Sequence, residues 1–267
     1  MDARPSHNAY LSGSMPRLFL RTAGPLVFVM AANGLQTVID GYFLGIFVGA
    51  DALAAVTLMF PLFMFLNAIA TLVSTGTASE LARQLGAGDL SAARRSFVSA
   101  HVLSVLICIP FVAGFAWFGP GLVAALANGS PRVADMSFRF MSILVWASPL
   151  QFALSLHGAA LRCEGRLAFM AIGSLVLSFA NIGFNYLLIV LLDQGVAGAA
   201  IGTVCAQGIA VLAFVLYRAW SRPPMRWPDM SFEGWNTGWG RVLALGAPQS
   251  LSFIGFSLTS AATIAAL

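Results

Sequence analysis

The sequence contains no lysine, and charged residues make up only 9% of its 267 residues. Soluble globular domains carry about 25% charged residues. Together with 59% hydrophobic residues and a mean hydropathy of +0.85, this scarcity of charge excludes a soluble globular domain. The pI of 9.4 does not indicate a nucleic-acid partner, because the 14 arginines are spread singly or in pairs and form no basic patch. The composition is typical of a polytopic membrane protein.

Cysteine is also scarce. Cys108, Cys163 and Cys205 are widely spaced, with no CxxC motif and no neighbouring histidine, so the sequence predicts neither a disulfide framework nor a metal site. No HExxH or GxSxG motif and no Cys/His pair at helical spacing supports an intramembrane enzyme. The polar first 16 residues lack the apolar region and cleavage site of a removed signal peptide. We therefore expect no cofactor and no enzymatic activity.

Seven apolar runs reach the length of about 20 residues that a membrane-spanning helix needs. They cover residues 18–47, 53–79, 93–118, 134–160, 168–192, 195–219 and 241–267. The predicted fold is therefore an all-α polytopic membrane protein with a six-helix transmembrane lobe followed by a seventh helix.

The arginines are distributed unequally between the two ends of these runs. Arg132 and Arg139 lie on one side of the membrane, and the other twelve of the 14 arginines lie on the opposite side. Because cytoplasmic loops carry an excess of basic residues, the N-terminus is predicted to be cytoplasmic. We expect a multi-pass protein of the plasma (inner) membrane.

Glycines recur at four-residue spacing in two of the runs. Gly41, Gly45 and Gly49 share one helical face, as do Gly198 and Gly202, which predicts close approach between helices. Prolines within or at the ends of the runs predict bends, because each removes a hydrogen bond within its helix. These prolines are Pro25, Pro61, Pro110 and Pro149.

Aromatic residues gather between the sixth and seventh runs. Phe232, Trp235 and Trp239 have i, i+3 and i+7 spacing, which in a helix puts them on one face. Near several arginines, that face is predicted to lie in the headgroup layer as a cytoplasmic interfacial elbow over 221–240.

Asp40 is an ionisable side chain inside the first run. Placing Asp in the bilayer core costs about 2.5 to 3.5 kcal/mol, so such a residue either serves a function or holds helices together by bonding its neighbours. Counted at 1.5 Å per residue from the nearest outer charge, Asp40 lies roughly 16 Å deep. Asn181, Asn185 and Thr203 lie at roughly 18, 12 and 15 Å, and the two asparagines share a face. The sequence therefore predicts one polar layer from three spans.

Other polar side chains inside the runs are weaker candidates. Gln36, Asn67, Gln151 and Gln207 are interpreted as possible cavity-lining residues. Asn185 and Thr203 also fit plain interhelical hydrogen bonding. No arginine is predicted deep within the first six runs.

Several segments resemble the multidrug and toxic compound extrusion (MATE) family. They are TVIDGYFLGIFVGADALAAVTLMFP, ELARQLGAGDLSAARR, LRCEGRLAFMAIGSLVLSFANIGFNYLLIV and GVAGAAIGTVCAQ, in family order along nearly the whole chain. The resemblance implies a cation-coupled exporter built of two six-helix lobes around a central cavity. It also implies that Pro25 matches the bend-forming proline of the first helix and Asp40 its acid. Asn181, Ala199 and Thr203 match cation-site positions.

The sequence departs from this pattern at Asn185, where many prokaryotic members have a second acid. Two close acids would raise the pKa of one of them. Here burial of Asp40 alone would have to do this if the coupling ion is a proton. Amide, hydroxyl and carboxylate oxygens fit a hard cation such as sodium equally well. The coupling ion can therefore be a proton or sodium. The candidate cation site consists of Asp40, Asn181, Asn185, Ala199 and Thr203.

The sequence thus predicts an antiporter that exports drugs or other organic, cationic compounds in exchange for protons or sodium. A lipid-linked or polysaccharide flippase of the same broad superfamily is the main alternative, and it would need a cationic cavity for phosphates. A non-transporting membrane scaffold is a third.

The expected organisation has three parts: an N-terminal lobe (1–220), the elbow (221–240) and the first helix of a second lobe (241–267). Aligning Pro248 with Pro25 supports a parallel repeat and places Thr263 opposite Asp40, so the second copy lacks the acid. We expect the chain to need a missing C-terminal lobe as its partner and to be inactive alone. The lipid bilayer and a small organic substrate are the other expected partners.

Overall fold

The computed structural model describes residues 15–127, 130–221 and 235–266, and all regular structure in these ranges is helical. Ten helical segments follow one another: α2 (Met15–Phe43), η1 (Leu44–Val48), α3 (Ala50–Gly86), α4 (Leu90–Leu126), α5 (Pro131–Trp146), α6 (Ser148–Cys163), α7 (Leu167–Asn185), η2 (Tyr186–Leu191), α8 (Gly195–Trp220) and α9 (Trp239–Ala266). The segments η1 and η2 are π-helical. The predicted all-α polytopic fold is confirmed.

Six of the described helices are long and apolar enough to cross a membrane, and the bent pair α5 and α6 makes a seventh if it counts as one span. The fourth predicted span is therefore broken at Ala147, where the chain bends by 51°. Pro149 follows directly in the first turn of α6, where its missing N–H breaks no helical hydrogen bond. In contrast, α3 and α4 continue through Pro61 and Pro110.

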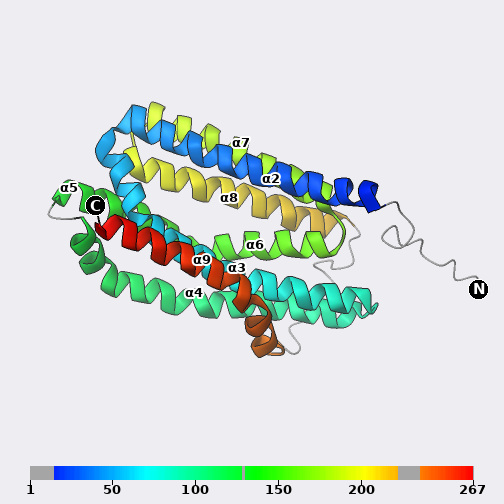
Figure 1. Ribbon diagram of the computed structural model, residues 1–267. Coiled ribbons are helices and arrows are strands. Elements are labelled where there is room, and N and C mark those ends of the chain that lie inside the picture. Colours follow the sequence, from blue (N-terminus) through cyan, green and yellow to red (C-terminus); the bar gives the residue numbers. More distant parts are fainter. Residues whose placement is uncertain (1–14, 128–129, 222–234, 267) are drawn as a thin grey trace, which may run out of the picture.

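The helices pack in two groups that are joined by α5 and α6, both of which contact α8 (Figure 1). On one side α2 lies against α7, and α7 lies against α8. On the other side α3, α4, α5 and α6 enclose the largest apolar core, in which Val73, Phe97, Met141 and Leu156 are almost fully buried. The predicted cation-site residues all lie in the layer formed by α2, α7 and α8.

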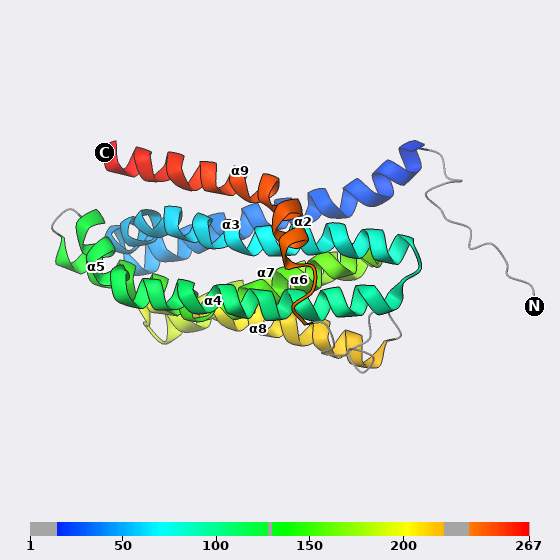
Figure 2. The same ribbon diagram turned by 90° about the horizontal axis from the view of Figure 1, so that it is seen from below.

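Helix α9 lies antiparallel along α3. In Figure 2, α9 and the N-terminal part of α2 extend towards opposite sides of the view. The two backbones touch at two glycines: a Cβ on Gly76 would lie 1.9 Å from the carbonyl oxygen of Val242, and one on Gly246 would lie 1.8 Å from that of Leu72. Further along, Ser257 Oγ donates a hydrogen bond to the Pro61 carbonyl at 2.8 Å. The seventh helix is therefore closely packed against the lobe.

We expect Gly246→Ala to destabilise the protein by about 1–3 kcal/mol, the usual cost of overpacking, because the added methyl group displaces α9 from α3. Thermal unfolding in detergent measures this. Gly255→Ala is the matched control on the same helix, since its Cβ would meet nothing within 4 Å. Equal melting temperatures for the two variants would contradict the close packing at Gly246.

The predicted close approach at Gly41, Gly45 and Gly49 is wrong. A Cβ at Gly41 or Gly49 would meet no described atom within 4 Å, and one at Gly45 would only reach Leu53 at 4.0 Å. The three glycines lie in different segments, because α2 ends at Phe43, η1 begins at Leu44, and Gly49 then turns the chain at φ 113°. At Gly198 and Gly202 the prediction is confirmed, because a Cβ on Gly198 would lie 3.1 Å from the backbone of Leu188 and one on Gly202 would lie 3.3 Å from Phe184 Cβ.

The aromatic face predicted for the elbow is not formed as expected. Residues 235–238 are turns and bends rather than the helix that the i, i+3, i+7 spacing requires, and Phe232 lies outside the described residues. Trp239, the first residue of α9, donates its indole N–H to Ser99 Oγ of α4 at 2.8 Å. This tryptophan therefore anchors α9 to α4 instead of sharing a lipid-facing surface.

Candidate functional site

Asp40 lies in the last turn of α2, four residues before η1 begins. Asn185 is the last residue of α7, directly before η2. The two π-helical segments pack against each other, so both polar residues lie where an α-helix changes its winding. Short π-helical segments within helices are frequent at functional sites. The local backbone thus marks this region independently of its side chains.

A chain of hydrogen bonds joins the predicted polar layer. Asn185 Nδ2 donates to Asp40 Oδ1 at 2.6 Å and to Asn181 Oδ1 at 3.3 Å. Asn181 Nδ2 donates to Thr203 Oγ1 at 3.2 Å, and Thr203 donates to the carbonyl of Ala199 at 3.0 Å. Asn181 and Asn185 are buried, and Asp40 is half-buried. The five residues therefore form one connected cluster from α2, α7 and α8.

The cluster holds an acceptor without a hydrogen-bond partner among the described residues. Asn185 Oδ1 is buried and accepts no hydrogen bond. It lies 2.7 Å from the position that a Cβ would take at Gly202, so only glycine leaves room for it there. A buried, unpaired polar oxygen is costly unless a ligand or an ion satisfies it. This oxygen is thus an unpaired acceptor within the cluster.

An apolar cluster separates these polar groups from the nearer end of the bundle. Leu44 of η1 and Ile189 of η2 pack with Ala52, Val196 and Ala199, each no more than 4% exposed. Ala199 belongs to both clusters, because its side chain packs here while its carbonyl accepts from Thr203. Water or an ion approaching from this end must therefore pass closely packed side chains.

The residues predicted to line a cavity fall into two groups. Asn67, Gln151 and Gln207 bond one another across α3, α6 and α8: Gln151 Nε2 donates to Asn67 Oδ1 at 3.2 Å, and Gln207 Nε2 donates to Gln151 Oε1. Gln36 instead accepts from Ser178 Oγ of α7 at 3.2 Å. These amides link helices, and their lining of a cavity stays a prediction.

The oxygens of the Asp40 cluster suit either a proton or a small hard cation. The cluster offers a carboxylate, amide oxygens, a hydroxyl and a backbone carbonyl, and hard cations prefer such ligands. A proton needs only the carboxylate of Asp40. The site therefore leaves both ions possible, as the sequence did. Pro25 lies within α2, and its predicted bend remains a prediction.

A second buried polar cluster was not predicted from the sequence. Arg218 lies in the last turn of α8, so it is consistent with the prediction of no arginine deep within the first six spans, yet its side chain has no exposed surface. Its Nη1 lies 2.8 Å from Glu164 Oε1, its Nε donates to His157 Nδ1 at 3.2 Å, and its guanidinium lies 5.0 Å from the ring centre of Phe97. The signal for this cluster in the sequence is that Glu164 and His157 lie near the same membrane face as Arg218.

Comparison with known proteins gives a family match over most of this fold. The MatE family model matches residues 25–187, which include Asp40, Asn181 and Asn185. The multidrug export protein MepA of Staphylococcus aureus is 23% identical over 202 residues, covering 72% of this chain and 43% of MepA. Multidrug and toxin extrusion protein 1 of Danio rerio is 26% identical over 244 residues, covering 87% of this chain and 39% of that protein.

A solved structure has the same fold. The crystal structure of MATE in complex with MaD3S superposes with a TM-score of 0.83 at 23% identity, covering 94% of this chain and 56% of that one. The chain therefore spans about half the length of the proteins that it matches.

Proposed function

The chain belongs to the MatE family, and from that premise we propose that it forms the ion-binding lobe of a cation-coupled antiporter that exports small organic compounds. A proton or sodium ion binds at Asp40, and the substrate leaves in exchange. A second lobe completes the transport cavity. The protein is a multi-pass protein of the plasma (inner) membrane with a cytoplasmic N-terminus, as the arginine distribution favours.

The observation that carries this proposal is the contact between Asp40 and Asn185. A half-buried carboxylate bonded to a buried amide at 2.6 Å, beside an unpaired amide oxygen, is a site for a positive charge. Coupling requires that the ion bind one conformation more tightly than the other. The clusters at Asp40 and at Leu44 share Ala199, so a movement of η1 and η2 would change the site and its access together.

The relatives support the class of substrate. MepA is named a multidrug export protein, and the Danio rerio relative a multidrug and toxin extrusion protein. The acid Asp40, surrounded by neutral amides and a hydroxyl, favours organic cations over anions by simple charge complementarity.

A phosphate-carrying substrate, as in a lipid-linked flippase, is less well supported. A flippase needs cationic groups facing its cavity, whereas the described groups bonded to Asp40, Asn181 and Asn185 are amides, a hydroxyl and a carboxylate, none of them cationic. Arg218 is buried, but it faces Glu164 and His157 at some distance along α8 from Thr203. No described contact of the Asp40 cluster therefore favours the flippase over the exporter.

Transport in reconstituted vesicles tests the proposal. The longest natural reading frame containing these residues is reconstituted, and efflux of a fluorescent organic cation is followed while the sodium and pH gradients are varied separately. We expect one of the two gradients to drive efflux against a concentration gradient. Efflux that is indifferent to both gradients would contradict ion coupling.

Asn185→Asp tests whether this residue faces Asp40 during transport. The new carboxylate would replace the amide that lies 2.6 Å from Asp40 Oδ1. Two carboxylates so close share one proton, because each disfavours ionisation of the other. We therefore expect the pH profile of efflux to move to higher pH. Asn236→Asp, in an exposed turn, is the control. An unchanged profile for Asn185→Asp would separate Asn185 from the ion site.

A further inference from the structure

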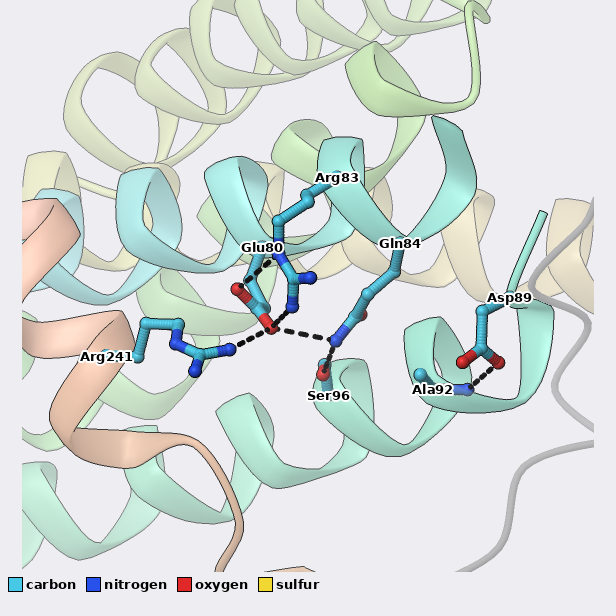
Figure 3. Close-up of polar contacts among 7 residues, drawn as sticks. All are labelled: Glu80, Arg83, Gln84, Asp89, Ala92, Ser96 and Arg241. Carbon is cyan, nitrogen blue, oxygen red and sulfur yellow. Dashed lines mark hydrogen bonds and ion pairs between the residues drawn. The ribbon is translucent and has the colours of Figure 1, made fainter. Parts of the chain in front are cut away.

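A pocket outside the Asp40 site lies between α3 and α9. It has a volume of about 540 Å³ and is lined by Ser79, Glu80, Arg83, Arg241 and Leu245. Figure 3 shows Glu80 and Arg83 extending from α3 and Arg241 approaching them from α9. The pocket thus combines two cations, one acid and one apolar wall, and the proposed transport function uses none of them.

The pocket presents a net positive charge because its acid is buried beneath its cations. Glu80 Oε1 lies 2.5 Å from Arg83 Nη2 and 3.3 Å from Arg241 Nη1 (Figure 3). Gln84 Nε2 also donates to this oxygen at 3.0 Å and to Ser96 Oγ of α4 at 2.8 Å. The Glu80 side chain is only 7% exposed, whereas each arginine side chain is 62% exposed. Each guanidinium has five N–H donors, so several remain to bind an anion.

The pocket lies at the depth of the lipid headgroups. Helix α3 has 37 residues, hence a length of about 55 Å, whereas the hydrocarbon core is about 30 Å thick. Both ends of α3 therefore extend beyond the hydrocarbon. Arg83 lies in the last turn of α3, and Glu80 lies one turn earlier.

The apolar wall lies deeper in the membrane than the two arginines. Leu245 follows Arg241 by one helical turn, in the direction in which α9 runs along α3 towards the membrane centre, and it is 44% exposed. A molecule that fills the pocket would meet cationic groups at its head and an apolar surface below. These properties match a phospholipid rather than a water-soluble compound.

We propose that this pocket binds the phosphate of an anionic glycerophospholipid such as phosphatidylglycerol, with an acyl chain against Leu245. Arginine is suited to phosphate because its planar donors bind two oxygens at once, and basic pockets between transmembrane helices bind anionic headgroups. Since α3 and α9 each supply one arginine, the bound lipid holds the start of α9 against the lobe.

Lipid binding to the purified full-length protein tests the proposal. Bound phosphatidylglycerol is titrated by native mass spectrometry against a phosphatidylethanolamine background. We expect Arg83→Gln and Arg241→Gln each to weaken phosphatidylglycerol binding about fivefold, the effect of one basic residue near an anionic lipid. Arg139→Gln is the matched control, because Arg139 is an exposed arginine near the other end of the bundle that pairs with Asp135.

Glu80→Gln separates lipid binding from a purely structural ion pair. Removing the acid raises the charge of the pocket by one unit, so phosphatidylglycerol binding should tighten about fivefold. A structural role alone predicts loosened α9 packing with no gain in lipid affinity. Melting temperatures in phosphatidylethanolamine alone show whether any variant is misfolded.

Two results would overturn the proposal. One is unchanged phosphatidylglycerol binding by the Arg83→Gln/Arg241→Gln double variant together with no tightening in Glu80→Gln. The other is displacement of phosphatidylglycerol by inorganic phosphate at equal concentration, which would make the pocket a site for free anions.

Discussion

Replacing Asp40 with Asn is expected to reduce gradient-driven efflux to background while the protein stays folded. Asn has nearly the same shape as Asp, and its oxygen can still accept the hydrogen bond that Asn185 Nδ2 now donates at 2.6 Å. The substitution removes only the charge, and with it the group that binds a proton or completes the ligands of sodium. Efflux of a fluorescent organic cation in vesicles, with each gradient imposed in turn, measures the loss.

Asp51→Asn is the matched control for this prediction. Asp51 lies at the start of α3, its side chain is 53% exposed, and it pairs with Arg132 at 3.4 Å. Exposed ion pairs of this kind contribute only about 0–1 kcal/mol, so this variant should transport like the wild type. Normal efflux by Asp40→Asn, at wild-type levels of folded protein, would exclude Asp40 as the coupling residue.

Replacing Arg218 with Met is expected to be the most destabilising charge change among the residues that the structure describes. Arg218 and Glu164 have no exposed side-chain surface and lie 2.8 Å apart. Removing one partner of a buried ion pair costs about 3–5 kcal/mol, because the charge of Glu164 stays buried while the guanidinium 2.8 Å away is lost. His157 and Phe97 also lose a contact, which loosens α4, α6 and α8 together. Thermal unfolding in detergent measures the effect.

The double variant Arg218→Met/Glu164→Gln distinguishes charge burial from lost packing. If the isolated charge causes the loss, the second substitution should recover part of the stability. Arg139→Met is the control, since Arg139 and Asp135 are 67% and 59% exposed and their pair should contribute little. Equal stability losses at Arg218 and Arg139 would contradict the prediction.

The sequence alone determined the membrane-spanning helices and the polar residues within them. Hydropathy and span length are local properties, because the bilayer requires about 20 apolar residues wherever a helix crosses it. All seven predicted runs therefore fall on described helices, and the fourth run is divided between α5 and α6. Asp40 was found in the same way, as a charge where charge is costly.

Only the tertiary structure decided which of these residues meet. Asp40 and Asn185 are 145 positions apart, and equal depth in the membrane does not make two side chains neighbours until α2 packs on α7. The same holds for Arg218, which looked like an interfacial arginine until α4, α6 and α8 enclosed it.

The glycines show the physical reason most directly. Gly41 and Gly202 both belong to four-residue glycine repeats, yet only Gly202 has another helix close enough to need the missing Cβ. Gly76 and Gly246 belong to no such repeat, yet a Cβ at either position would lie within 2 Å of a backbone oxygen of the facing helix. A glycine permits close approach, but the partner that uses this space comes from a distant part of the chain. The sequence therefore determined where helices and charges lie along the membrane, and packing determined their contacts.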